Sequence, residues 1–301
     1  MTINAWLSNA ILKLESASVP TARLDAEVLL ADILGKDRSW VLAHPDFTLQ
    51  GPTLQKLNKQ IDRRVEHEPL AYIRGKQEFY GREFIVSPDT LTPRPETETM
   101  IEMLLEEVKS KKWEDGSGKP KELNPTPYPL LTIVDIGTGS GCIIITAALE
   151  LSTTAYPLPP IHYIGLDISK PALKIAKQNS KKFKADVSFK KFDLTQESLP
   201  LNPTPYTLIT ANLPYVPEDF QINLAATHEP AFAIYGGKDG LDFYRKLFAQ
   251  LKTSHFPAQT SGCTILTESM PPQHDALKEI ALKNGYKLHK TQDFIQLFIQ
   301  K

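Results

Sequence analysis

The spacing of apolar residues near the N-terminus predicts three amphipathic helices. Within residues 1–16, apolar side chains recur at three- and four-residue steps, and the same period returns within 24–34 and 54–65. Gly35 stands where a helix commonly ends. These stripes consist of Trp6, Leu7, Ala10, Ile11 and Leu14, then Leu24, Ala26, Leu29, Leu30, Ile33 and Leu34, then Leu54, Leu57, Ile61 and Val65. We therefore expect an all-helical domain over residues 1–67.

The pattern changes to that of a β-hairpin over residues 68–95. Aromatic and apolar residues there alternate with two glycines, Gly75 and Gly81. We expect this segment to link two domains. The hairpin positions are Tyr72, Phe79, Tyr80, Phe84 and Val86. A helix over residues 100–108 should follow, beginning at Pro95 or Thr97.

Strand and helix patterns alternate in the rest of the chain. Residues 109–129, rich in Lys, Gly, Ser and Pro, interrupt them as an expected surface loop. Strands are predicted at 131–135, 162–167, 187–193, 206–211, 263–268, 286–290 and 294–299, and helices at 141–151, 171–183, 241–251 and 275–283. This order predicts an α/β fold with a mostly parallel sheet and helices on both faces. The last two strands have no helix between them and should form an antiparallel edge.

Composition narrows the class of protein. The 301 residues suffice for about two domains, and 34 Lys and Arg against 35 Asp and Glu give a net charge of -1. A general nucleic-acid binder would be more basic. No apolar run approaches the ~18 residues of a membrane span, and the N-terminus resembles neither a signal nor a transit peptide. The two distant cysteines, Cys142 and Cys263, favour a reducing cytoplasm over a disulfide scaffold or zinc module.

A glycine-rich loop at residues 135–141, Asp-Ile-Gly-Thr-Gly-Ser-Gly, is the first candidate site. It follows a predicted strand and opens a helix, and its glycines allow close approach of the backbone to a ligand. It is no P-loop, because Cys142 stands where that motif needs Lys. The loop predicts a nucleoside or dinucleotide site, and a tight turn without a ligand is the alternative.

Carboxylates end the next two predicted strands. Asp167 could accept hydrogen bonds from ribose hydroxyls, or could cap the following helix. Asp193 and Leu194 could recognise the amino group and ring of adenine, or could form a strand-terminal turn. In either position the carboxylate would lie at the edge of the sheet where ligands bind.

The sequence Asn212-Leu213-Pro214-Tyr215 follows the fourth predicted strand. A side chain there points into the ligand crevice of a parallel sheet. The Asn212 side-chain oxygen and the Leu213 carbonyl can both accept hydrogen bonds from one –NH2 group, and Tyr215 offers a flat face to an amide or base. A plain Asn-x-Pro turn is the alternative, weakened by the three sites that precede it along the same sheet.

Together these motifs resemble class I S-adenosylmethionine-dependent methyltransferases that act on planar nitrogens. The segments at 68–75, 79–81, 91–98, 229–230 and 236–244, with the helical domain before them, are similar to the HemK/PrmC-type release factor glutamine methyltransferases. The resemblance covers nearly the whole chain. It departs at Leu213, where the family has the first Pro of Asn-Pro-Pro-Tyr, so the carbonyl is kept and the φ restraint is lost. Leu194 also replaces an aromatic residue of some relatives.

The resemblance implies a fold, a reaction and a partner. The fold would be a Rossmann-like seven-stranded methyltransferase sheet over residues 96–301. The reaction would transfer a methyl group from S-adenosylmethionine to the side-chain amide nitrogen of glutamine in the Gly-Gly-Gln motif of a peptide chain release factor. The release factor would dock on residues 1–67. We expect a monomer that needs no metal, membrane or direct nucleic-acid contact.

The resemblance also assigns residues. Catalysis would fall to Asn212, Leu213, Pro214 and Tyr215, and cofactor binding to Gly137, Thr138, Gly139, Ser140, Gly141, Asp167, Asp193, Leu194 and Asn212. From the residues themselves, a basic face for docking could comprise Arg63, Arg64, Arg74, Lys76 and Arg82, and an ordinary solvated surface is the alternative for each of them. We expect Glu229 to brace the loop after Tyr215, and His228 to be structural rather than a general base.

Two other classes of function stay open at this point. One is methylation of a ribosomal-protein glutamine or of an exocyclic amino group in DNA or rRNA. The other is a non-catalytic module that binds an adenosyl ligand or the translation machinery. A dehydrogenase is disfavoured, because no hydride-transfer residues accompany the glycine loop.

Overall fold

The computed structural model describes residues 1–111, 131–154, 158–200, 206–253 and 263–301, and most of the loop expected at 109–129 lies outside them. The described chain forms two compact units. One consists of Met1–Gln77 with Ile222–His228, and the other of Glu78–Gln221 with Glu229–Lys301. The segment expected as a linker, 68–95, is therefore divided between the two units.

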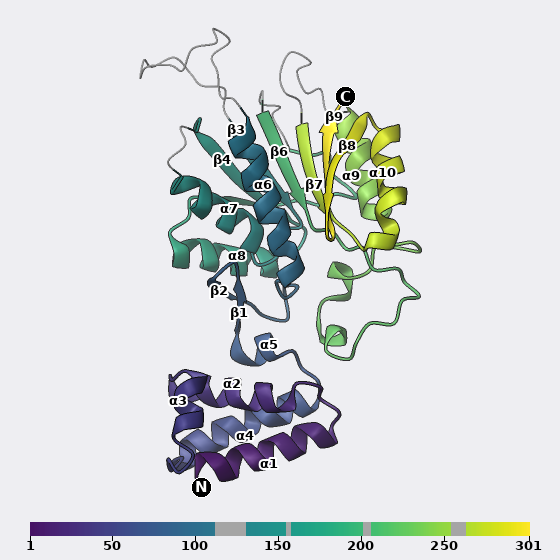
Figure 1. Cartoon of the computed structure of the whole chain (residues 1–301). Coiled ribbons are helices and arrows are strands. Elements are labelled where there is room, and N and C mark those ends of the chain that lie inside the picture. The colour runs from purple at the N-terminus through teal and green to yellow at the C-terminus, as the bar shows by residue number, and fades with distance from the viewer. Residues whose placement is uncertain (112–130, 155–157, 201–205, 254–262) are drawn as a thin grey trace. The chain divides into compact units, whose positions relative to one another are not determined.

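The N-terminal unit is helical, as its apolar stripes predict. Its helices are α1 (Ile3–Ser16), α2 (Ala22–Leu34), α3 (Arg38–Ala43), α4 (Gly51–Val65) and α5 (Leu70–Arg74) (Figure 1). The apolar stripes of α1, α2 and α4 pack into one core. The Thr2 hydroxyl caps α1 by accepting a hydrogen bond from the Ala5 N–H, and Gly35 ends α2 with a left-handed φ of 62°.

The hairpin is shorter than expected. It consists of β1 (Lys76–Phe79) and β2 (Arg82–Ile85), and the placement of Tyr72 in a strand is wrong. Tyr72 lies in α5, a single helical turn that Pro69 precedes and that Gly75 ends with a φ of 73°. The periodicity of so few residues cannot separate a strand from one turn of helix.

The second unit contains a seven-stranded sheet in the order β5-β4-β3-β6-β7-β9-β8. Neighbours among β3, β4, β5, β6 and β7 are parallel, whereas β9 is antiparallel to β7 and β8. The mostly parallel sheet with an antiparallel edge is thus confirmed. The strands are β3 (Leu131–Ile136), β4 (Ile161–Asp167), β5 (Ser188–Lys191), β6 (Tyr206–Ala211), β7 (Cys263–Glu268), β8 (Tyr286–Gln292) and β9 (Ile295–Gln300).

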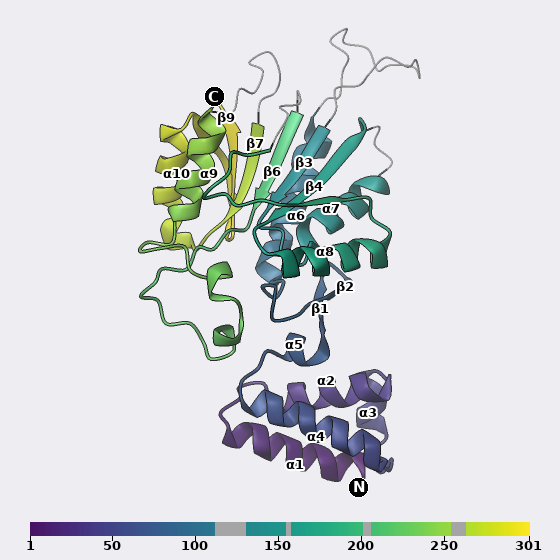
Figure 2. The same cartoon turned by 180° about the vertical axis from the view of Figure 1, so that it is seen from behind.

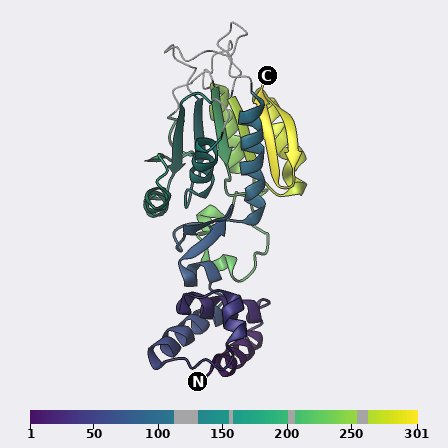
Figure 3. The same ribbon diagram turned by 60° about the vertical axis from the view of Figure 1, so that its left-hand side comes forward.

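Helices cover both faces of this sheet. Successive residues of β3 point to opposite sides, so Ile133 packs in the core with α6 and α7, and Val134 in the core with α9 and α10. Figures 1 and 2 show these two faces, and Figure 3 shows α6 running alongside the strands. The helices are α6 (Glu98–Ser110), α7 (Cys142–Ser152), α8 (Lys170–Phe183), α9 (Asp242–Thr253) and α10 (His274–Lys283).

The strand order and register place the site. The chain leaves β3 toward β4 and β5 on one side and returns to β6 and β7 on the other, so the order reverses between β3 and β6. Ligands bind at such a switch point, beyond the carboxyl ends of the strands. Ile136 is level with Leu166 and Ala211, and Ala211 with Thr267. The next residue of each strand, namely Asp167, Gly137, Asn212 and Glu268, therefore falls in one row at this edge.

Three further findings concern membrane-spanning helices, metal sites and cysteines. No helix in the described ranges is long and apolar enough to cross a membrane. In the same ranges, no group of three or more His, Cys, Asp or Glu residues could hold a metal ion. Cys142 and Cys263 are both buried and free.

Candidate active site

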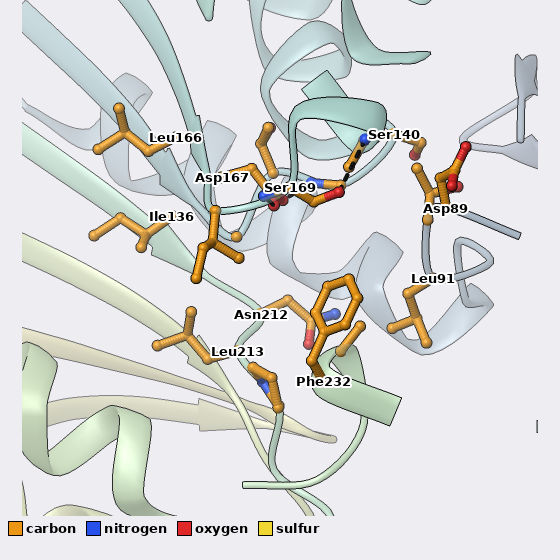
Figure 4. A pocket seen from close by; sticks show the side chains of 18 of the residues that line it. Asp89, Leu91, Ile136, Ser140, Leu166, Asp167, Ser169, Asn212, Leu213 and Phe232 are labelled. Atoms are coloured by element: carbon orange, nitrogen blue, oxygen red, sulfur yellow. Dashed lines mark hydrogen bonds between the residues drawn. The ribbon is translucent and has the colours of Figure 1, made fainter. Parts of the chain in front are cut away.

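A cavity of about 600 Å³ opens at the carboxyl edge of the sheet. In Figure 4, Asp167 and Ser169 lie on one side of this space, and Asn212, Leu213 and Phe232 lie on another. Gly141 and Tyr215 are not among the lining residues. The site residues expected from the sequence that do line it are Gly137, Thr138, Gly139, Ser140, Asp167, Asp193, Leu194, Asn212, Leu213 and Pro214.

Asp135 stabilises the glycine loop through a hydrogen bond with Thr138. Asp135 is fully buried, and its two carboxylate oxygens accept hydrogen bonds from the Thr138 hydroxyl (2.6 Å) and the Thr210 hydroxyl (2.8 Å). Burial raises the pKa of Asp135 to about 6, although both hydroxyls oppose that shift. A Cβ atom on Gly141 would lie only 2.9 Å from Ile145 Cδ1, so this glycine serves the packing of α7.

Asp167 joins the glycine loop to the start of α8. One carboxylate oxygen accepts a hydrogen bond from the Gly139 N–H and the other from the Ser169 N–H, both at 2.8 Å. Burial raises the pKa of Asp167, and these backbone donors oppose the shift. The helix cap itself is Ser169, whose hydroxyl accepts from the Ala172 N–H. Because a carboxylate oxygen can accept two hydrogen bonds, Asp167 can still bind hydroxyls in the cavity.

Asp193 and Leu194 lie in the turn after β5. The Thr195 hydroxyl and N–H both donate to Asp193 Oδ1, at 2.7 and 2.8 Å, and these hydrogen bonds lower the pKa of Asp193. Apolar side chains that the sequence analysis did not single out also line the cavity, and they include Ile136, Leu166, Ile168, Phe192 and Phe243. Two carboxylates beside an apolar lining fit the ribose and adenine of an adenosyl group.

The bend at Asn212 is fixed from several sides. The Asn212 side-chain Nδ2 donates to the Thr97 hydroxyl at 3.2 Å, and the Leu213 N–H donates to the Tyr244 hydroxyl at 3.3 Å. The Gln273 side chain donates to the Tyr215 carbonyl at 2.7 Å. Glycines give this bend room, because a Cβ atom on Gly236 would overlap the Pro214 carbonyl, and one on Gly240 the Tyr215 carbonyl.

Tyr215 is not among the residues that line the cavity, and its hydroxyl reaches Glu268. Its hydroxyl donates to Glu268 Oε1 at 3.0 Å, and Glu268 is only 1% exposed. Burial raises the pKa of Glu268, and its neighbours Thr97, Tyr215 and Asn212 oppose that shift as donors. Glu268 was not expected at the site from the sequence, although it ends the predicted strand 263–268 just as Asp167 ends another.

A second set of contacts lies beside the cavity. Arg94 lines it and forms an ion pair with Glu229, whose side chain is 1% exposed. Arg94 is thus a hydrogen-bond partner of Glu229, and the expected role of Glu229 in bracing the loop after Tyr215 stays a prediction. Phe232 also lines the cavity while 57% exposed. His228 does not line it, and its ring instead contacts the Glu66 carbonyl within the N-terminal unit.

The five cations expected to form a basic docking face are all ion-paired, and a docking role for them stays a prediction. They share four acidic partners, so their charge is offset in part. The pairs are Arg63 with Glu68, Arg64 with Asp25, Arg74 and Lys76 with Asp32, and Arg82 with Glu150. The sequence pattern could not show this, because three of the four acidic partners, Asp25, Asp32 and Glu150, come from distant parts of the chain.

Comparison with known proteins shows which families the two parts of the chain match. Residues 5–75 match the PrmC N-terminal domain family, and residues 129–255 match a methyltransferase domain family. The release factor glutamine methyltransferase of Koribacter versatilis is 36% identical over 255 residues, which cover 83% of this chain and 81% of that protein. The protein of the same name from Bacillus subtilis is 35% identical, over 75% and 72%.

A solved structure adds a more distant likeness. The ribosomal protein L11 methylase of Lactobacillus delbrueckii subsp. bulgaricus has a TM-score of 0.44 and 16% identity, over 75% of this chain and 90% of that one. The identity and coverage of the two bacterial relatives settle the family. This chain belongs to the release factor glutamine methyltransferases.

Proposed function

We propose that this protein transfers a methyl group from S-adenosylmethionine to the side-chain amide nitrogen of a glutamine in a peptide chain release factor. One observation carries the proposal beyond family membership. The bend at Asn212 and Leu213 lies level with the glycine loop and lines the same cavity as Asp167. A carboxamide at this bend would thus share a cavity with a bound nucleoside.

The residues present fit S-adenosylmethionine. Gly137 and Gly139 line the cavity with left-handed φ values of +76° and +52°, which bring the loop backbone to its wall. Asp167 can accept the ribose hydroxyls, and Asp193 and Leu194 can contact the adenine. When bound, this cofactor supplies a methyl group made electrophilic by the positive sulfur. Gly141 is left with a packing role, and stacking of Tyr215 on the substrate stays a prediction.

The chain's own task is to present a poor nucleophile. The lone pair of an amide nitrogen is delocalised into the carbonyl group, as the planarity of the peptide bond shows. Asn212 Oδ1 and the Leu213 carbonyl would each accept one N–H of the glutamine amide and so fix the nitrogen in place. Such orientation of bound reactants can contribute ~7–11 kcal/mol relative to a bimolecular reaction.

The same two oxygens would also favour the transition state. Positive charge grows on the glutamine nitrogen as the new bond forms, which strengthens both N–H hydrogen bonds. Acceptors held in advance by the fold therefore bind the transition state more tightly than the substrate. No strong base is needed at any stage, because the nitrogen that has used its lone pair to bind the methyl group is strongly acidic and releases its proton to water.

Several finer expectations stay predictions from the sequence. On the function, these are the Gly-Gly-Gln motif as the target, docking of the release factor on residues 1–67, independence of nucleic acid and a cytoplasmic location. On the structure, they are the domain boundaries 68–95 and 96–301 and a monomeric state. Mass spectrometry of release factors incubated with this protein and S-adenosylmethionine tests the target directly. We expect a single methyl group on one glutamine.

Asn212→Ala tests the role of the bend. We expect it to abolish methyl transfer while the dissociation constant of S-adenosylmethionine changes little, because the glycine loop and Asp167 are intact. Near-normal turnover in this variant would contradict the proposed role. Methylation of a ribosomal protein or nucleic acid, and not of a release factor, would contradict the proposed substrate.

A further inference from the structure

We propose that Glu268 is a positioning residue that decides which way round the Asn212 side-chain amide lies. This inference rests on the proposed function and deepens it. Glu268 is not among the residues that line the cavity, so it would act only through Asn212 and its neighbours.

The fold brings the two side chains together. Ala211 of β6 is level with Thr267 of β7, so Asn212 and Glu268 are the next residues on adjacent parallel strands. Glu268 is buried, and its Oε2 atom has no hydrogen-bond partner among the described residues. The Asn212 and Thr97 side chains both lower the pKa of this carboxyl, so they lie within its reach. A buried acceptor without a hydrogen bond is costly and calls for an explanation.

Orientation matters because the two ends of an Asn amide have nearly the same shape. A half-turn about χ2 would exchange the oxygen and the –NH2 group of Asn212 at little steric cost. With –NH2 toward the cavity, the substrate amide would meet a donor where it needs an acceptor. Half of the proposed double acceptor would then be lost.

Thr97 cannot select the productive orientation by itself. Its hydroxyl receives a hydrogen bond from Asn212 Nδ2 here, but a hydroxyl can donate to an oxygen equally well. An ionised carboxylate only accepts, so it attracts the –NH2 end of Asn212 and repels the oxygen end. Glu268 therefore supplies the asymmetry that Thr97 lacks.

The carboxylate is itself held in place. Tyr215 donates to Oε1, and the Tyr244 hydroxyl donates to the Glu268 backbone carbonyl. Tyr244 also accepts the Leu213 N–H, so one hydroxyl ties the end of β7 to the bend. This gives Tyr215 a role that agrees with its absence from the cavity lining.

Glu268→Gln tests the proposal, because glutamine keeps the shape and adds a donor, which removes the selection. We expect kcat to fall about 10- to 100-fold, with the KM for release factor and the affinity for S-adenosylmethionine almost unchanged. Thr267→Val is the matched control, since Thr267 is equally buried on the same strand and its hydroxyl faces the Gln296 carbonyl. It should retain the wild-type kcat.

Glu268→Asp separates orientation from stability. Aspartate keeps an acceptor-only group but leaves a gap, so it should be less stable than the Gln variant and yet have the higher kcat. A residue needed only for folding would give the opposite ranking. A wild-type kcat in Glu268→Gln, or kcat values that follow the melting temperatures, would overturn the proposal. Absence of release factor methylation by the wild-type protein would instead contradict the proposed function.

Discussion

Arg94 and Glu229 form an ion pair that joins two segments lining or adjoining the cavity. The Arg94 Nη2 atom lies 2.6 Å from Glu229 Oε2, although 135 residues separate them in the chain. Glu229 is buried at its side chain, whereas Arg94 is partly exposed. This contact thus joins the segment with Pro93 to the segment with Phe232, and both segments line the cavity.

Breaking this pair should loosen the segment that follows Glu229. Arg94→Met leaves the buried Glu229 carboxylate without its partner, and Glu229→Gln leaves the Arg94 cation without an opposite charge beside it. We expect faster hydrogen exchange at residues 229–235 in each single variant, and less so in the double variant, with a coupling of about 0.5–3 kcal/mol. Exchange measured by mass spectrometry checks this, and purely additive effects would contradict it.

The Tyr244 hydroxyl should matter more in this chain than it would beside a proline. Leu213 supplies an N–H that Tyr244 accepts, and proline at this position would not. Tyr244→Phe leaves that buried N–H unsatisfied, at a cost of about 1–3 kcal/mol. We expect the cost to be smaller in a Leu213→Pro background.

Urea unfolding of the four proteins in this cycle measures the coupling. Equal costs of Tyr244→Phe in both backgrounds would show that the N–H contributes nothing. Leu213→Pro should remain active, since the carbonyl at 213 is kept. A folded but inactive Leu213→Pro protein would contradict the acceptor role of that carbonyl.

Asp135 should make stability fall as the pH rises. Its pKa is raised to about 6 from 3.8, so between these values the folded state holds a proton that the unfolded state has lost. Unfolding free energy from this group should therefore decrease by about 3 kcal/mol as the pH rises from about 4 to above 6. Asp135→Asn should remove that component. The unfolding free energies of the wild-type and Asp135→Asn proteins should be measured at several pH values. An equal change with pH in both proteins would contradict the assignment.

Gly240 should be needed for the shape of the backbone bend at residues 212–215. Alanine there would adopt an unfavourable φ of +78° and would also overlap the Tyr215 carbonyl. Gly285 is a matched control, with a φ of +89° and no atom near the added Cβ. We expect Gly285→Ala to cost only the strain of ~1–2 kcal/mol and to keep its activity.

Gly240→Ala should lose more stability than this control and should also lose methyl transfer, because the clash falls on the backbone of the proposed acceptor bend. Melting temperatures and turnover of the two variants decide the matter. Equal melting temperatures together with full activity in Gly240→Ala would contradict the close approach seen here.

Much of the fold could be predicted from local sequence. The strands β6 (Tyr206–Ala211) and β7 (Cys263–Glu268) begin and end where their buried apolar runs predict. The glycine loop and Asn212 could be found because each directly follows such a strand. These features depend on which side of a segment is buried, and that information lies in neighbouring residues.

The tertiary structure alone decided the partners. Glu268 meets Asn212 only because β7 is next to β6 in a fixed register, and Arg94 meets Glu229 across 135 residues. Arg64 forms an ion pair with Asp25 of another helix, a partner that helix periodicity does not indicate. Periodicity records burial but carries no information on strand order or on the partner of a charge, because both are set by how distant segments pack together.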